Sequence, residues 1–433
     1  MVRTCVLRKE SGSARGEQVC GGERSPERHS SKASVSPDAP VRGVIGGAGA
    51  ASCTRGVSSL QSGPGQGSRL SGPACMVLVL VLPVMACSGR AKIAPSRRSW
   101  EEPVALTMNA AAAPGGKCGS GPGQLFPPAA PWNTRVDATA VAPASSAAIG
   151  FLQRAHVERI RFQVDFSFNV LSAGPATPRL SFSPTEDFYS PHCDPAAVPV
   201  PASGAIEGEP GYECTQDGDC HLIVADLTGC RLWEMWRADI RNGNFRGGCL
   251  AIWDLRRVYP PTGRGRDCTS ADAAGLPIAP LLFSADDIAA GEIRHALRFV
   301  LPNSLIRRGS YVAPATHTTS ATRAPSEAPP YGARMRLKAG VDIQTLRPAA
   351  RIVARALQTY GMFLADGGRV TFTAVSDAFT VHRWSDVELG PHDLKVLQWT
   401  DFEMVDSGPL IRFEDRCNRE PITTASAASV LPE

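Results

Sequence analysis

Cysteine is the residue that most restricts what this chain can fold into. Eight cysteines follow residue 87, an even number, and six of them fall between Cys193 and Cys268. A zinc site is the alternative to disulfide bonds. However, the chain has no Cys-x2-Cys pair, and Cys214-x5-Cys220 is too wide for a zinc-ribbon knuckle. We therefore expect a disulfide-stabilised fold made in an oxidising compartment, with a connectivity that the sequence leaves open.

A short apolar run predicts export. Residues 74–87 read ACMVLVLVLPVMAC, with Arg69 upstream. A membrane-spanning helix needs about 20 apolar residues, so this run has the length of a signal-peptide core instead. Its end, VMACSG at 84–89, resembles a bacterial lipoprotein cleavage box in which Cys87 would become the lipidated first residue. Ordinary secretory cleavage after Ala86 is the alternative.

Composition divides the rest of the chain. The N-terminal part is rich in Gly, Ser and Arg and has no aromatic residue, so it cannot bury enough apolar surface to fold. A later stretch alternates small residues with Gly and Pro, as a mobile linker does. We expect five segments: 1–75 as a disordered or untranslated extension, 76–87 as the signal or lipoprotein segment, 88–125 as a flexible linker, 126–407 as a single β-rich globular domain, and 408–433 as a C-terminal tail.

Charge excludes one class of partner. The formal net charge is only +4 and the basic residues are dispersed, without the Lys/Arg runs and interleaved aromatics of a nucleic-acid binder. We expect no nucleic-acid partner, and membrane contact only through a lipid anchor at Cys87. The sequence decides neither a cofactor nor an oligomeric state.

The apolar pattern after residue 160 mostly has the period of two that is typical of half-buried strands. Strands are expected at 161–168, 179–182, 221–226, 230–236, 296–300, 335–339, 362–366 and 370–375. The pair 221–226 and 230–236 predicts a hairpin closed at Thr228-Gly229, with Cys220 and Cys230 as candidates to bridge its ends. Gly367-Gly368 is expected to form a tight turn between the last two strands.

Two segments have helical patterns. One is the stretch 145–154. The other is 347–360, which Pro348 opens and Gly361 closes, with apolar residues on one face. Many short strands with few helices predict a mainly β fold, either a sandwich or a curled antiparallel sheet with one or two helices, stabilised by disulfide bonds.

Several stretches carry a family resemblance. They are PWNTRVD at 131–137, AIEG at 205–208, the hairpin from 218 to 236, TSADAAGLPI at 269–278 continuing to GEIRHALRF at 291–299, and YGMFLADG at 360–367. In these the chain is similar to a family of exported bacterial proteins of no established activity, some of which carry carbohydrate-binding modules. The resemblance covers about residues 126–407. It implies an exported fold and a connection to glycans.

The candidate catalytic residues lie in the longest of these stretches. Asp272 stands in a Ser/Ala/Gly loop, where a carboxylate can face a cleft, and Glu292 and His295 are three residues apart before a strand. Together they could perform general acid–base chemistry on a polysaccharide, as a glycoside hydrolase or a lyase does. The structural alternative is that Asp272 caps a turn and Glu292 pairs with Arg294 or Arg298.

Three further residues are candidates for substrate binding: His221, His317 and Trp253. His221, His295 and His317 could also converge on a metal, but their spacing does not indicate it, and no metal site is expected. The sequence does not decide whether the protein is an enzyme. One hypothesis is an exported cell-envelope protein that acts on polysaccharide by acid–base chemistry. The other is a non-catalytic envelope lipoprotein that binds polysaccharide or a protein partner.

Overall fold

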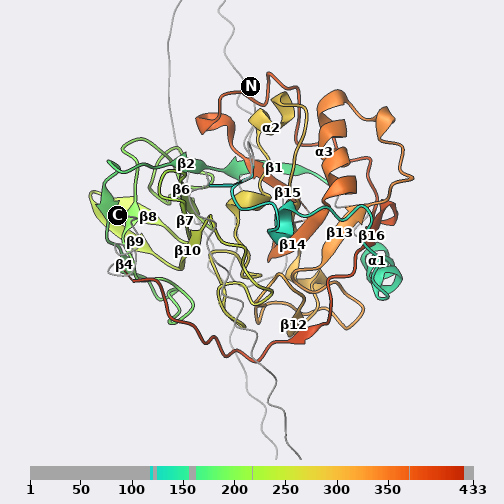
Figure 1. The fold of residues 1–433 in the computed structure, drawn as a ribbon, viewed down its shortest axis with the longest axis horizontal. Coiled ribbons are helices and arrows are strands. Elements are labelled where there is room, and N and C mark those ends of the chain that lie inside the picture. The colour runs from blue at the N-terminus through green and yellow to red at the C-terminus, as the bar shows by residue number, and fades with distance from the viewer. Residues whose placement is uncertain (1–117, 120–123, 156–161, 217, 370, 424–433) are drawn as a thin grey trace, which may run out of the picture. The chain divides into compact units, whose positions relative to one another are not determined.

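The computed structural model describes residues 118–119, 124–155, 162–216, 218–369 and 371–423, and these are coloured in Figure 1. The predicted segments 1–75 and 76–87, with Cys87, and most of the predicted linker 88–125 lie outside the described residues. Among the described residues, no helix is long and apolar enough to cross a membrane.

The predicted mainly β class is confirmed. The described part of the chain contains 17 strands, distributed over several sheets, and three α-helices. The sandwich is not confirmed, and the two larger sheets are mixed instead of purely antiparallel, because each includes parallel strand pairs.

The larger sheet has six strands in the order β1-β15-β11-β14-β13-β16. Their bounds are Val164–Phe168 (β1), Thr371–Val375 (β15), Leu297–Leu301 (β11), Met362–Gly367 (β14), Arg334–Leu337 (β13) and Phe402–Met404 (β16). The predicted tight turn at Gly367-Gly368 between neighbouring strands is wrong. Strand β11 lies between β14 and β15 and pairs with both, so the two consecutive strands do not meet.

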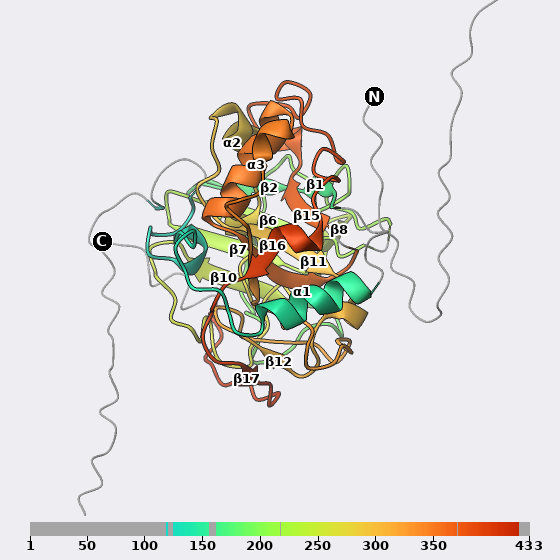
Figure 2. The same cartoon turned by 90° about the vertical axis from the view of Figure 1, so that its right-hand side faces the viewer.

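Helices cover part of this sheet. Helix α3 (Pro348–Thr359) packs against β13 (Figure 1), and α1 (Ser145–Arg154) packs against β16 (Figure 2). Both follow their predicted ranges. In α3 the buried residues include Ala350, Val353, Ala354 and Leu357, a spacing that makes one apolar face. A third helix, α2 (Ala285–Ala289), is short and begins with a capping box.

The second large sheet contains the predicted hairpin. Its order is β10-β7-β6-β2, with bounds Leu250–Asp254 (β10), Arg231–Met235 (β7), Leu222–Asp226 (β6) and Val170–Ser172 (β2). Strands β6 and β7 pair antiparallel from Leu222–Met235 to Asp226–Arg231. The Asp226 carboxylate accepts hydrogen bonds from the N–H groups of Thr228 and Gly229, which closes the turn.

The remaining elements are short. Small sheets join β3 (Arg179–Leu180) to β5 (Val198–Pro199), β4 (Ser183–Pro184) to β9 (Asn244–Gly247) and β8 (Asp239–Arg241), and β12 (Ser310–Tyr311) to β17 (Ile411–Arg412). Single 3-10 turns occupy Pro131–Asn133 (η1), Ala279–Leu281 (η3), Asn303–Leu305 (η4), Ile343–Thr345 (η5), Asp377–Phe379 (η6) and Trp399–Asp401 (η7).

All eight cysteines from residue 118 onward are paired: Cys118–Cys230, Cys193–Cys249, Cys214–Cys220 and Cys268–Cys417. The predicted Cys220–Cys230 bridge is therefore wrong. Each of these cysteines lies at the start of its strand, and the starts of antiparallel neighbours are at opposite ends of the hairpin. Four disulfide bonds indicate an oxidising, non-cytoplasmic environment.

The C-terminal segment 408–423, which we call the strap, follows the surface of the domain. Strand β17 pairs with β12, and Cys417 is bonded to Cys268. Beyond the disulfide, Arg419 donates to the buried Asp194 carboxylate at 2.6 Å, and the N–H of Ile422 donates to the same carboxylate at 2.7 Å. The strap is thereby fixed along its length.

Candidate functional site

The site is built on the loop 269–275, TSADAAG, which we call the Asp272 loop. Its main chain is held by three histidines on alternate residues: His192 Nδ1 accepts from Thr269 N at 3.0 Å, His221 Nε2 donates to Ala271 O at 3.0 Å, and His317 Nδ1 donates to Ala273 O at 2.8 Å. These histidines come from three distant parts of the sequence. The loop is therefore a fixed platform whose position depends on the tertiary fold.

A close approach at its end requires glycine. Gly275 has a φ of +75°, and a Cβ there would lie 2.2 Å from Thr316 Oγ1. Thr316 donates its hydroxyl hydrogen to the carbonyl of Cys268 and its N–H to the carbonyl of Ala274. A side chain at residue 275 would push this segment away from the Asp272 loop.

The side chain of Asp272 forms a buried ion pair with Arg298. Its Oδ1 accepts from Arg298 Nε at 2.9 Å and from Arg298 Nη2 at 2.8 Å. The same Nη2 donates to Asp366 Oδ2 at 3.0 Å, so one guanidinium nitrogen joins two carboxylates. The side chain of Asp272 is 0% exposed, whereas that of Asp366 is 20% exposed. The two carboxylates therefore have different environments although they share one cation.

This arrangement favours a proton on Asp272. Burial raises the pKa of Asp272 above its usual range, the charge of Arg298 opposes that shift, and the charge of Asp366 adds to it. Oδ2 of Asp272 is buried without a hydrogen-bond partner among the described residues. A carboxyl group with a raised pKa and one unengaged oxygen can act as a proton donor.

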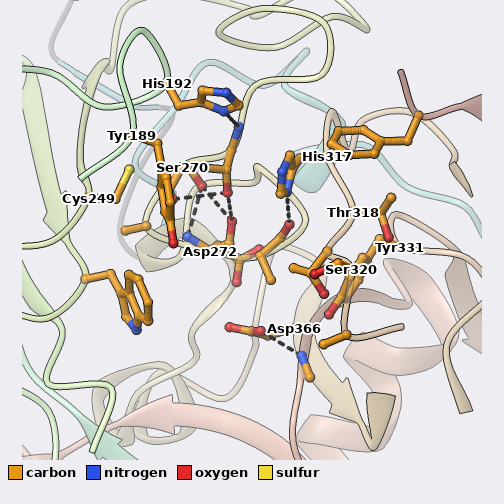
Figure 3. Close-up of a pocket in the computed structure, with 18 of the residues that line it drawn as sticks. Tyr189, His192, Cys249, Ser270, Asp272, His317, Thr318, Ser320, Tyr331 and Asp366 are labelled. Atoms are coloured by element: carbon orange, nitrogen blue, oxygen red, sulfur yellow. Dashed lines mark hydrogen bonds between the residues drawn. The ribbon is translucent and has the colours of Figure 1, made fainter. Parts of the chain in front are cut away.

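A cavity of about 470 Å³ opens over the Asp272 loop (Figure 3). Asp272 and Asp366 line it together with Tyr189, His192, His317 and Tyr331. Hydroxyl and aromatic groups make up much of the remaining wall, including Thr269, Ser270, Thr318, Ser320, Trp236 and Phe413. Such walls suit sugars, whose hydroxyls need hydrogen bonds and whose C–H faces stack on rings.

A second cavity of about 200 Å³ adjoins the first. Asp219, Asp366 and Gly367 line both. Asp165 lies in the second cavity, where burial and the charge of Glu207 raise its pKa to about 6. Arg298 also lines this second cavity, so the Asp272–Arg298–Asp366 group lies at the junction of the two.

His221 lines the second cavity and is a charged group. Its Nδ1 lies 2.6 Å from Glu207 Oε2, and its Nε2 donates to Ala271 O. Burial lowers the pKa of His221, but the charge of Glu207 and the hydrogen bond to it raise the pKa to about 9. At neutral pH both ring nitrogens therefore carry protons, and His221 holds the Asp272 loop instead of accepting protons from a ligand.

His192 and His317 are neutral in contrast. Burial lowers the pKa of both, to about 4 for His192. Because the N–H of Thr269 donates to His192 Nδ1, the proton of His192 is on Nε2. Because His317 Nδ1 donates to Ala273 O, its Nε2 is an acceptor. The cavity wall therefore offers one imidazole donor and one imidazole acceptor.

Of the site residues predicted from the sequence, some line the two cavities and others do not. Asp272 and His317 line the first cavity and His221 lines the second. The other two proposed catalytic residues, Glu292 and His295, line neither. Glu292 is exposed and forms an ion pair with Arg294 at 3.2 Å. His295 is 1% exposed, and its Nδ1 donates to Ala296 O.

Trp253 is a core residue. It is 1% exposed, packs edge-on against Phe126 and Tyr259, and donates its indole N–H to Glu234 at 2.9 Å. The predicted role of Trp253 in stacking on substrate is therefore corrected, because no face of its ring is accessible. Trp236 is the tryptophan that lines the first cavity.

Sequence reasoning missed most of the charged groups around Asp272. Asp366 lies in the YGMFLADG motif and Glu207 in the AIEG motif. Both motifs were singled out in the sequence, but their acidic residues were not predicted to belong to the site. His192 stands between a proline and a cysteine and has no such signal.

The alternative considered from the sequence, that His221, His295 and His317 converge on a metal, has no support in the described residues. His221 and His317 bond different carbonyls of the Asp272 loop, and His295 bonds its neighbour. Within the described ranges, the group of possible metal ligands in mutual reach is Glu209, Cys214 and Cys220. Its two cysteines are joined in a disulfide and offer no thiolate.

Comparison with protein-family models, with curated proteins and with solved structures finds no match to this chain.

Proposed function

We propose that this protein hydrolyses glycosidic bonds, with Asp272 as the proton donor and Asp366 as the second carboxylate. The observation that carries the proposal is the pair of hydrogen bonds from Arg298 Nη2 to Asp272 Oδ1 and Asp366 Oδ2, 2.8 and 3.0 Å long, at the wall of a sugar-sized cavity. Two carboxylates in unlike environments are the recurring requirement for glycoside hydrolysis.

The proposed reaction uses the carboxyl groups of Asp272 and Asp366 and one water molecule. Asp272 gives its proton to the glycosidic oxygen as the bond from that oxygen to the anomeric carbon breaks. The ionised Asp366 attacks the anomeric carbon from the other side and forms a glycosyl ester. Water, deprotonated by Asp272, then displaces Asp366 and restores both groups. The two oxygens bound to one nitrogen are closer together than an inverting mechanism requires, which supports retention of configuration.

The location remains part of the proposal. The apolar run ending at Cys87 supports a lipid anchor in the cell envelope, and the disulfide bonds are compatible with export. The resemblance to the exported family with carbohydrate-binding modules supports a glycan as the substrate. The first hypothesis from the sequence is kept, but with Asp366 in place of Glu292 and His295.

The test is product analysis of the oxidised protein. Incubation with a panel of neutral and acidic polysaccharides, followed by mass spectrometry, should give new oligosaccharides whose masses include one added water per cleavage. Asp272→Asn and Asp366→Asn should each reduce the rate about a hundredfold or more, because proton donation and the second carboxylate are both lost.

Asp286→Asn is the matched control, because Asp286 is a surface carboxylate that bonds His382 and lines neither cavity. It should keep full activity. Thermal unfolding of all three variants shows whether they are folded. No product from any glycan, or full activity in a folded Asp272→Asn protein, contradicts the hydrolase proposal and favours the non-catalytic binding protein.

A further inference from the structure

The first cavity has an unbalanced charge. Of its 21 lining residues four are aspartates, Asp219, Asp272, Asp366 and Asp415, and none is lysine or arginine. With the proton on Asp272, the negative charge lies on the other three. A cleft lined by charge of one sign concentrates its field and repels ligands of the same sign.

The cations behind the wall are already paired with carboxylates and do not line the cavity themselves. Arg298 is bound to Asp272 and Asp366. Arg264 and Arg419 each donate to the carbonyl of His192, but both are ion-paired to the fully buried Asp194, at 2.5 and 2.6 Å. Guanidinium groups that are already paired with carboxylates cannot turn to receive an acidic ligand without leaving a buried charge unpaired.

The two histidines of the wall add no positive charge near neutral pH, because burial holds the pKa of both below the usual range. Oδ2 of Asp272 is buried and has no hydrogen-bond partner among the described residues. This independently indicates that a ligand in the cavity forms a hydrogen bond to it. When protonated this oxygen donates a hydrogen bond, which a glycosidic or hydroxyl oxygen can accept.

We infer that the first cavity selects uncharged sugar units and rejects sugars that carry carboxylate or sulfate groups. The inference deepens the proposed hydrolysis and rests on it for the identity of the ligand as a glycan. It also separates the two reactions that the sequence left open. A lyase abstracts a proton beside a uronic carboxylate, and that carboxylate would have to lie among the carboxylates of Asp219, Asp366 and Asp415.

The strap supplies part of this selectivity. Phe413 lines the cavity with its ring edge-on to His317, 4.9 Å between centroids, and Asp415 lines it two residues later. Asp415 is exposed and lies outside the Asp272–Arg298–Asp366 group, so its charge can be changed without touching the proposed catalytic carboxylates.

The test compares binding on an array of glycans in matched neutral and uronic or sulfated forms, with the intact oxidised protein. Neutral members should bind on the order of ten times more tightly than their acidic counterparts at low salt, and the difference should shrink as salt screens the cavity. Asp415→Lys should reduce that discrimination several-fold. Glu420→Lys makes the same charge change on an exposed strap residue that lines neither cavity and should leave the discrimination unchanged.

The outcomes separate the two proposals. Tighter binding of acidic glycans, or equal binding of both forms, overturns the charge selection and leaves hydrolysis open to its own assay. Binding of neutral glycans without any cleavage overturns hydrolysis and supports the charge selection. Binding to no glycan overturns both.

Discussion

His221 and His317 both donate a hydrogen bond to a carbonyl of the Asp272 loop, yet their surroundings make His221 a cation and leave His317 neutral. His221 lies against Glu207, which raises its pKa to about 9, whereas burial lowers the pKa of His317. At the scale of the residue, the charge of each histidine is therefore decided by what surrounds it besides the loop carbonyl: Glu207 for His221, and burial for His317. One histidine anchors the loop as a cation, and the other presents a neutral acceptor to the cavity.

Glu207→Gln should destabilise the protein most in mildly acidic solution. The pKa of His221 is higher in the folded protein than the unfolded value of 6.5, so its contribution is complete below pH 6.5 and disappears as the pH rises through about 9. The full contribution is about 3 kcal/mol. Denaturant unfolding at about pH 6 should show most of this loss, and unfolding at about pH 9.5 should show little. Glu186→Gln, the same change at an exposed glutamate, should change neither. An equal loss at both pH values would contradict the charged state of His221.

At the scale of the element, the strap contributes to both stability and the cavity wall. It is attached at β17, at Cys417 and at Arg419, and Phe413 and Asp415 line the first cavity between these points. Cys268, the disulfide partner of Cys417, immediately precedes the Asp272 loop. Movement of the strap would therefore shift the cavity wall and the loop together.

Replacing both Cys268 and Cys417 by serine should cost more stability than replacing Cys214 and Cys220. The first bridge spans 149 residues and the second spans 6. Chain entropy gives about 5 kcal/mol for the longer loop and about 2 kcal/mol for the shorter one. Denaturant midpoints of the two double variants, measured at one pH, provide the comparison. A larger loss in the Cys214/Cys220 variant would show that the strap is not held as described.

At the scale of the whole molecule, the sequence predicted elements that form within one segment of the chain. It did not predict how strands from distant segments pair. The helix at 347–360 and the hairpin at 221–236 were predictable because periodicity and turn residues lie within each segment. The insertion of β11 between β14 and β15 was not predictable, because it joins strands more than 60 residues apart in the chain. A turn signal such as Gly367-Gly368 shows where a strand ends and not what lies beside it.

The candidate site follows the same rule. Asp272 could be found from its loop composition, because a carboxylate among Ser, Ala and Gly is a local feature. Its partners Arg298 and Asp366 come from β11 and β14, and only the pairing of these strands brings them together. Glu292 was chosen because it stands three residues from His295 before a strand, but its side chain is exposed and forms an ion pair with Arg294.

The buried titratable groups together predict how the stability of the whole molecule changes with pH. Burial raises the pKa of Glu234 to about 7, and that of Asp272 is raised as well, so the folded state retains protons that the unfolded state releases. Both contributions fall as the pH rises toward 7, and the contribution of His221 falls from pH 6.5 to about 9. His192 and His317, with lowered pKa values, favour the opposite trend, but that trend fades above pH 6.5, where less than half of the histidine protons remain on the unfolded chain. We therefore expect the free energy of unfolding to decrease between about pH 6.5 and pH 9, a slope that the Glu207→Gln variant should flatten. Denaturant titrations at half-unit pH intervals measure the slope, and a rise in stability across that interval would mean that these groups are not buried in the charge states that the site requires.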